Sequence, residues 1–280
     1  MPFKANADMQ LLAHGLSTLL APAATTLFIV ALGLMVETLS SRAAACPVRG
    51  VMFNLFYLVP LQLLHAASVP AVAGVAVAVT NRLGGGLIML PSFGWRLAPA
   101  VAAYALAMNL GEYLFHRAQH RVPLLWAMHS LHHSDPAVNI STTQRHFWVE
   151  QAIKSVTIYM AVGLLFRSNT AIATLYGVLS LWNYFAHMNL RLGFGRVWFL
   201  LNSPQFHRVD HSARAEHYDR NFAALFPIFD AIFRSVHVPE RSEFPPTGLD
   251  DGDSPRSLTE AVLWPARRWL RRTPRWLAAR

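Results

Sequence analysis

The chain has 280 residues, of which 54% are hydrophobic and only 14% are charged. Soluble domains usually carry about 25% charged residues, so this composition, with its mean hydropathy of +0.30, indicates a membrane protein. The net charge of +9 gathers largely at the C-terminus, without a basic groove interleaved with aromatic residues. It therefore argues for contact with a membrane surface and against nucleic-acid binding.

Five apolar stretches are predicted to form membrane helices. The first follows MPFKANADMQ, which lacks the basic start and cleavage site of a signal peptide, so we expect a retained span. The single cysteine, Cys46, lies between the first and second stretches. One cysteine can form neither an intramolecular disulfide nor a thiolate metal cluster. The second stretch contains two prolines, which can kink a membrane helix without ending it. The last two form either a helical hairpin or two short tilted spans. The stretches cover residues 16–38, 51–80, 97–115, 151–166 and 170–186.

The predicted fold is thus all-α, a polytopic membrane helical bundle with four or five spans. Arginines lie among the histidines described below and again in residues 256–280, and the positive-inside rule places both on the cytoplasmic side. In this tail, arginine pairs accompany Trp264, Trp269 and Trp276. The pattern is typical of an interfacial amphipathic segment, although a disordered basic tail has the same composition. Residues 241–256 are rich in Pro, Gly and Asp and are expected to form a surface linker.

Histidines recur at short helical spacings. The first group is HRAQH, residues 116–120, and the second is HSLHH, residues 129–133. Both spacings place the imidazoles on one face of a helix, and Pro123 between them is expected to mark a helix boundary. His187 ends an apolar run, and the third group lies in SPQFHRVDHS, residues 203–212. Segments that are distant in the chain can therefore converge on one point.

The eight imidazoles in these groups would be costly as packing alone. A buried neutral imidazole needs partners for both ring nitrogens, and an unsatisfied one costs about 1–3 kcal/mol. A bound cation removes this cost, because each ring gives it one lone pair and offers the other nitrogen to a neighbouring acceptor. One tetrahedral zinc takes four ligands, so eight imidazoles imply two metal ions. The HExxH pattern of zinc peptidases is absent from HRAQH, and a dinuclear redox metal at a membrane suggests dioxygen chemistry on a lipid.

In this order, HRAQH, HSLHHS, FAHMN and SPQFHRVDHS followed by DRNFA resemble the boxes of the fatty acid hydroxylase/sterol desaturase superfamily, over about residues 110–235. The resemblance implies a helical membrane bundle capped by a cytoplasmic, histidine-rich metal-binding domain with a non-haem di-iron centre. It also implies O2-dependent hydroxylation or desaturation of a lipid. The chain then divides into an N-terminal transmembrane region (1–95), a fatty acid hydroxylase-like catalytic domain (96–240), and a linker with a basic interfacial tail (241–280).

Carried over residue by residue, the resemblance implies nine candidate metal ligands. The sequence departs from the family at Asp210, which stands where the last box, H-x-x-H-H, has a histidine. Because a carboxylate can bind iron, Asp210 is expected to be a ligand or a direct neighbour of one. It could instead orient an imidazole, or the second metal could bind weakly. The candidate ligands are His116, His120, His129, His132, His133, His187, His207, Asp210 and His211.

Polar residues near the boxes are candidates for hydrogen bonds to these ligands. Glu112 lies one helical turn before His116 and is expected to accept a ring N–H. Asp219 and Asn221 belong to DRNFA, where the family has a comparable D-x-N. Supporting or capping roles are also open to Asn139, Arg145, Glu150 and Asn189. Of the other histidines, the candidates for extra ligands are His146 and His217, and those expected to be ordinary interior or surface residues are His14, His65 and His237.

The predicted function is a membrane-bound, O2-dependent lipid hydroxylase or desaturase with two iron ions. Its partners would be a lipid from the bilayer and a separate electron-transfer protein of ferredoxin or cytochrome type. The Ala- and Arg-rich composition indicates a bacterial inner membrane, with the site facing the cytoplasm. Two alternatives stay open. A zinc-dependent membrane hydrolase would need neither O2 nor a reductant, and a non-catalytic membrane protein with a degenerate metal site would account for Asp210.

Overall fold

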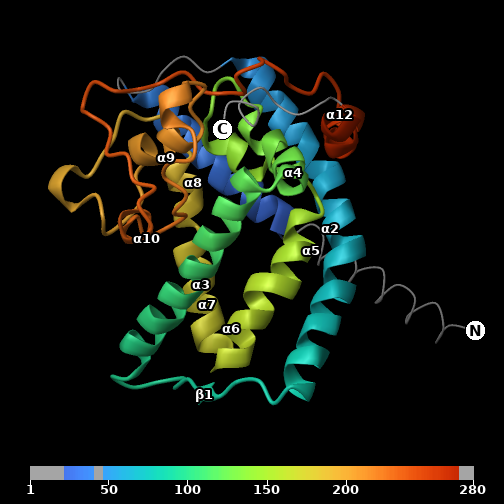
Figure 1. The fold of residues 1–280 in the computed structure, drawn as a ribbon, viewed down its shortest axis with the longest axis vertical. Coiled ribbons are helices and arrows are strands. Elements are labelled where there is room, and N and C mark those ends of the chain that lie inside the picture. The colour runs from blue at the N-terminus through green and yellow to red at the C-terminus, as the bar shows by residue number, and fades with distance from the viewer. Residues whose placement is uncertain (1–21, 41–46, 271–280) are drawn as a thin grey trace, which may run out of the picture.

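The computed structural model describes residues 22–40 and 47–270. Long helices run side by side away from a loop-rich cap (Figure 1). The helical segment built from α5, η2 and α6 contacts both α2 and α3, and α7 packs on α3. The predominantly helical fold expected from the sequence is confirmed. The helices of the bundle are α2 (Val48–Arg82), α3 (Leu97–Arg121), α5 (Glu150–Lys154), the π-helical η2 (Ser155–Tyr159), α6 (Met160–Leu165) and α7 (Thr170–Ser180).

Within the described residues, two helices are long and apolar enough to cross a membrane: Pro22–Leu39 and α2. Pro60 and Pro70 lie inside α2 without ending it, as expected. Apolar side chains on both helices face outward, among them Phe28, which is 70% exposed. Such faces suit a lipid environment better than water. The other three stretches also form helices, but none of these combines the length of a span with sufficient hydropathy; α3, with 25 residues, is long enough but less apolar. The start of the first stretch (16–21) and Cys46 lie outside the described residues.

The far end of the bundle is closed by a short parallel pairing of β1 (Ile88–Met89) with β2 (Phe166–Arg167). Asn169 reinforces it, because its side chain donates to the carbonyl of Leu90 and accepts from the backbone N–H of Ile172 to cap α7. The stretches 151–166 and 170–186 therefore form a helical hairpin whose two arms meet at this end (Figure 1).

The cap is built from short helices on the α4 side of the bundle (Figure 1). Glu37 joins the N-terminal helix to it by accepting the backbone N–H groups of Ile140 and Asn189, both at 2.9 Å. The helices of the cap are α4 (Pro123–His133), η1 (Ile140–Gln144), α8 (Trp182–Ala186), η3 (Gly195–Val197), α9 (Pro204–Asp210), η4 (Ala215–His217), α10 (Ile228–Ile232), α11 (Leu258–Val262) and α12 (Trp264–Leu270).

The C-terminal segment differs from the expected interfacial tail. Trp264 is fully buried in a hydrophobic core shared by α2, α4 and α11, and its indole N–H donates to Oγ of Ser130 on α4 at 2.9 Å. The indole is buried because its apolar ring fills a gap beside the histidine-bearing helix while its polar edge still finds a partner. Trp269 is half exposed, and Trp276 lies outside the described residues.

Candidate metal centre

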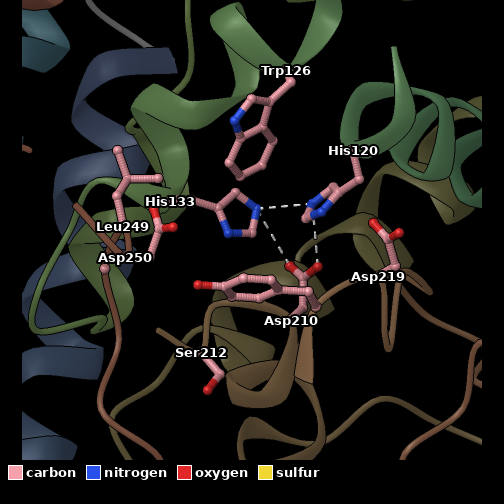
Figure 2. A pocket seen from close by; sticks show the side chains of 10 residues that line it. His120, Trp126, His133, Asp210, Ser212, Asp219, Leu249 and Asp250 are labelled. Atoms are coloured by element: carbon pink, nitrogen blue, oxygen red, sulfur yellow. Dashed lines mark hydrogen bonds and ion pairs between the residues drawn. The ribbon is translucent and has the colours of Figure 1, made fainter. Parts of the chain in front are cut away.

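The turn between α3 and α4 brings the first two histidine groups together. Val122 is extended and Pro123 opens α4, because a residue before proline disfavours the helical conformation while proline suits a helix start. The chain therefore folds back, and His120 on α3 faces His133 on α4, with their Nε2 atoms 3.2 Å apart (Figure 2). We call the four imidazoles that meet here the first histidine cluster: His116, His120, His129 and His133.

A second group of four lies against the first. Nε2 of His187 is 3.0 Å from Nε2 of His132 and 3.1 Å from Nε2 of His207. Ser203 caps the start of α9 by accepting the N–H of Phe206, and α9 then carries His207 one turn before His211. We call this the second histidine cluster: His132, His187, His207 and His211.

The two histidine clusters adjoin, because α4 supplies residues to both and the rings of His133 and His211 stack with centroids 4.4 Å apart. All eight imidazoles predicted from the sequence are thus brought together. Seven of them are buried, and His116 is nearly so. Burial is the largest cause that lowers the pKa of every one of these rings, that of His187 to about 3. The rings are therefore neutral near pH 7, the state in which imidazole binds metals.

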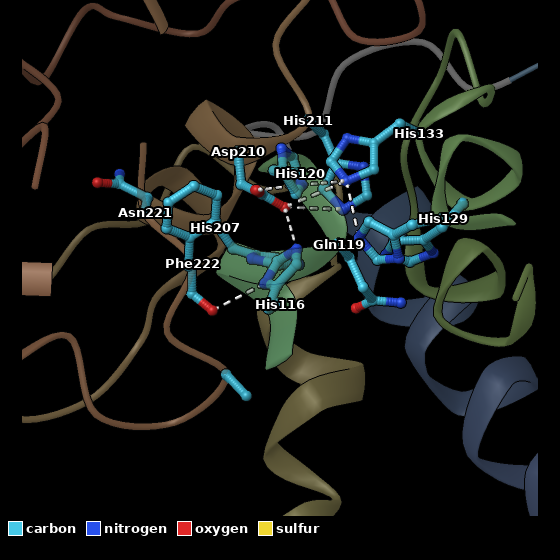
Figure 3. Close-up of polar contacts among 12 residues, drawn as sticks. His116, Gln119, His120, His129, His133, His207, Asp210, His211, Asn221 and Phe222 are labelled. Atoms are coloured by element: carbon cyan, nitrogen blue, oxygen red, sulfur yellow. Dashed lines mark hydrogen bonds and ion pairs between the residues drawn. The ribbon is translucent and has the colours of Figure 1, made fainter. Parts of the chain in front are cut away.

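Asp210 lies where the two clusters meet (Figure 3). Its carboxylate oxygens are 3.4 Å from Nε2 of His120, 3.6 Å from that of His116 and 3.7 Å from that of His133. Nε2 of His211, in the second cluster, is 3.8 Å away. These distances exceed those of hydrogen bonds, and they suit a carboxylate that shares a cation with the rings. Burial raises the pKa of this carboxyl well above its usual value.

Buried polar atoms without a hydrogen-bond partner gather at this centre. Such atoms are uncommon in proteins, because each one forfeits the hydrogen bonds that it made in water. A cation bound among them would satisfy ring nitrogens and carboxylate oxygens together, so the donor set fits metal ions. The atoms are Nε2 of His116, Nδ1 of His132, Nδ1 of His207, both oxygens of Asp210 and both ring nitrogens of His211.

Neighbouring groups orient several rings, but Glu112 does not bond to His116, contrary to the prediction. Its carboxylate pairs with Lys154 at 2.6 Å, and Nδ1 of His116 instead donates to the carbonyl of Phe222 at 2.8 Å. The reason is that Lys154, 42 residues away in sequence, reaches Glu112 across the bundle and holds its carboxylate. Nδ1 of His187 likewise donates to the carbonyl of Asn183 at 2.7 Å.

Glu150, for which a supporting or capping role was predicted as possible, is buried beside the first histidine cluster. Its Oε2 lies 3.4 Å from Nδ1 of His129 and 3.2 Å from Nδ1 of His146, and it accepts a hydrogen bond from Gln119 at 2.7 Å. His146 stacks on His132 with centroids 4.1 Å apart. In the sequence, the spacing of four residues between His146 and Glu150 was the signal that could have predicted this contact.

The two DRNFA residues both adopt a left-handed backbone, with φ of 59°. Asp219 lines a pocket of about 40 Å³ beside His120, Trp126 and Asp210 (Figure 2). Asn221 donates to the carbonyls of Phe206, in the middle of α9, and of His237. Asn221 therefore positions the helix that carries His207 and His211, without bonding to a ring of either cluster.

Residues 101–235 match the family model "Fatty acid hydroxylase". This part of the chain belongs to the fatty acid hydroxylase superfamily. The match covers both histidine clusters and the DRNFA motif, in agreement with the resemblance drawn from the boxes. No solved structure matches the chain significantly.

Curated relatives in the fatty acid hydroxylase superfamily include the alkylglycerol monooxygenases of Danio rerio and Homo sapiens. The Danio protein is 33% identical over 129 residues, which are 46% of this chain and 28% of that protein; the human protein gives 33% over 128 residues, with the same shares. Ornithine lipid hydroxylase OlsE of Rhizobium tropici is 24% identical over 158 residues, 56% of this chain and 46% of that protein. The match thus spans less than a third of the monooxygenases and less than half of the hydroxylase.

Proposed function

We propose that this protein is a membrane-bound, O2-dependent lipid hydroxylase with a histidine-ligated di-iron centre. The observation that carries the proposal is the pair of adjoining clusters of four imidazoles each, of which seven are buried and His116 is nearly so. The names of its superfamily relatives, which are monooxygenases and hydroxylases of lipids, favour hydroxylation over desaturation. The coarser statement, membership of a family of lipid-modifying oxidoreductases, rests on the family match itself.

The first histidine cluster would hold one iron and the second cluster the other, with Asp210 as an anionic ligand or direct neighbour where they meet. When bound, the irons would supply the redox chemistry that activates O2. Hydroxylation of a C–H bond consumes O2, two electrons and two protons and yields an alcohol and water. The electrons would come from a separate ferredoxin- or cytochrome-type protein. The chain's own residues keep the rings neutral and oriented and keep bulk water from the centre.

A cavity of about 160 Å³ between α3, α7 and α8 is the proposed entry for the lipid. Two of its lining residues, Glu112 and Asn183, lie one helical turn before His116 and His187, so the cavity reaches toward one member of each cluster. Its walls combine apolar side chains with the ion pair of Glu112 and Lys154. This lining suits an amphiphilic lipid whose polar group lies near the carbon that reacts.

The proposed placement in the membrane has four or five spans with the cap on the cytoplasmic side of a bacterial inner membrane. The outward apolar faces of Pro22–Leu39 and α2 support membrane insertion, and the arginines of the cap and tail support its orientation. The proposed organisation keeps residues 1–95 as the N-terminal transmembrane region, 96–240 as the catalytic domain and 241–280 as linker and tail.

Lipid analysis with matched variants tests this function. Membrane lipids from cells that express the chain are compared by mass spectrometry with those from cells that express His207→Ala or, as the control outside both clusters, Thr38→Ala. We expect lipids that have gained one oxygen atom in the wild type and in Thr38→Ala, but not in His207→Ala. The purified, iron-loaded protein with a chemical reductant should form the same product in air and none without O2.

Each alternative predicts a different result. Lipid turnover that persists without O2 and without reductant would establish a zinc-dependent hydrolase. A loss of two hydrogen atoms in place of the oxygen gain would establish a desaturase. Protein that folds but retains neither iron nor zinc after mild purification would leave a non-catalytic protein with a degenerate site.

A further inference from the structure

A third group of ligand atoms lies beside α9, outside both histidine clusters. Nε2 of His217 and Nε2 of His237 are each 2.9 Å from Oε1 of Glu243, and the two rings have centroids 4.7 Å apart. All three ligand atoms lie within 4.8 Å of one another. We infer that these residues form an additional metal site, which binds one Zn²⁺ ion.

The donor set is one that zinc uses. Two imidazoles and one carboxylate bind zinc in proteins, with a water molecule at the fourth tetrahedral position. Ligand atoms around a tetrahedral zinc are about 3.3 Å apart, so the two contacts to Glu243 need to open by only a few tenths of an ångström.

Neighbouring groups hold all three ligands in place. Nδ1 of His217 bonds to Oγ of Ser212 at 2.8 Å, which turns Nε2 toward Glu243. The other oxygen of Glu243, Oε2, accepts the backbone N–H of Glu240 at 3.0 Å. Asn221 accepts the backbone N–H of His237 at 2.7 Å. Such supporting bonds are typical of metal ligands, because they reduce the freedom that is lost when the ion binds.

The exposure of the ligands differs from that of the two clusters. The side chain of His217 is 2% exposed, whereas those of Glu243 and His237 are 16% and 34% exposed. One side of the triad therefore faces solvent, which gives an ion a route of entry and leaves room for a water ligand. The ion would therefore exchange with solution, unlike one held by four protein ligands in a closed structural site.

The position of the triad suggests what the ion stabilises. His217 belongs to the segment that follows α9, and Glu243 belongs to a loop whose backbone carbonyl accepts a hydrogen bond from Gln205 of α9 at 2.7 Å. A zinc ion here would join these two segments around the helix that carries His207 and His211. The inference does not depend on which metal the two clusters hold.

Metal analysis of matched variants tests the site. The full chain, purified in detergent without a histidine tag, is loaded with zinc alone, desalted and analysed for zinc per chain. We expect Glu243→Gln to bind one zinc fewer per chain than the wild type. The control Glu240→Gln, which changes an exposed carboxylate in the same turn, should match the wild type. Zinc should raise the unfolding temperature of the wild type more than that of Glu243→Gln.

Equal zinc content in Glu243→Gln and the wild type would overturn the site and leave a hydrogen-bonded triad. If Glu243→Gln does not fold, His237→Gln makes the same comparison at the most exposed ligand. Crystals of the zinc-loaded wild type provide a measurement that needs no variant. An anomalous peak at the zinc edge between the three side chains supports the site, and its absence at full zinc loading refutes it.

Discussion

Replacement of Glu37 tests how the N-terminal helix supports the metal centre. Glu37 is 4% exposed, and its Oε1 accepts the backbone N–H groups of Ile140 and Asn189. Asn189 lies two residues after His187 of the second cluster. Glu37→Ala would leave both buried N–H groups without an acceptor, whereas Glu37→Gln retains a carbonyl oxygen at the same position.

The expected size of the effect follows from these two bonds. Each buried donor left unsatisfied costs about 1–3 kcal/mol, so Glu37→Ala should lower the free energy of unfolding by about 2–6 kcal/mol. Glu37→Gln should lower it less, by about 1 kcal/mol for each of the two bonds, the difference between a charged and a neutral acceptor. Thermal unfolding in detergent, followed by tryptophan fluorescence, measures both. Metal content should fall in Glu37→Ala, because the backbone that follows His187 loses its anchor.

The control is Thr38→Ala, which removes an exposed hydroxyl that donates to the carbonyl of Met35 in its own helix. It should unfold close to the wild-type temperature. If Glu37→Ala unfolds at the same temperature as Glu37→Gln, the two N–H bonds do not stabilise the fold, and the proposed link from the N-terminal helix to the cap is refuted.

Three further predictions concern the centre and its support. Metal analysis should find one iron fewer per chain in His116→Ala and in His207→Ala than in the wild type, and none in the double variant. Loss of both ions in either single variant would contradict two separable sites. Asp210→Asn should weaken iron binding by at least about 10–100-fold in competition with a chelator, and unchanged binding would exclude the carboxylate as a ligand. Trp264→Ala should destabilise the fold by about 3–5 kcal/mol, while Trp269→Ala, at a half-exposed position, should unfold close to the wild-type temperature.

The convergence of the histidines could be predicted from the sequence because it follows from local rules. Spacings of three and four residues place rings on one face of a helix, and a proline between two such runs breaks the helix. In the structure, α3 ends at Arg121, two residues before Pro123, and His120 and His133 face each other across the break. Helix geometry and one proline were sufficient for this part of the centre.

Side-chain partners that are distant in the chain could not be predicted in the same way. Glu112 was assigned to His116 because they share a helix face, but Lys154 from another helix pairs with it. Glu37 joins Ile140 and Asn189, and no periodicity in the sequence relates these positions. His237 was set aside because it lies outside the boxes, yet the fold places its ring against that of His217. Such pairings are decided by tertiary packing, which a single sequence does not encode in any local pattern.

In the proposed metal centre, Asp210 would change the charge as well as the ligand set. The imidazoles are neutral because burial lowers their pKa values, so they contribute no charge to offset two divalent ions. A histidine at position 210 would add one more neutral donor. Burial raises the pKa of the Asp210 carboxyl, so a bound cation would displace its proton and leave a negative charge within 3.8 Å of rings from both clusters. Because Coulomb interactions strengthen in a buried site, this charge should favour the metal-bound protein over the metal-free one. The departure from the family's last box is therefore consistent with a functional centre whose ions are held partly by charge.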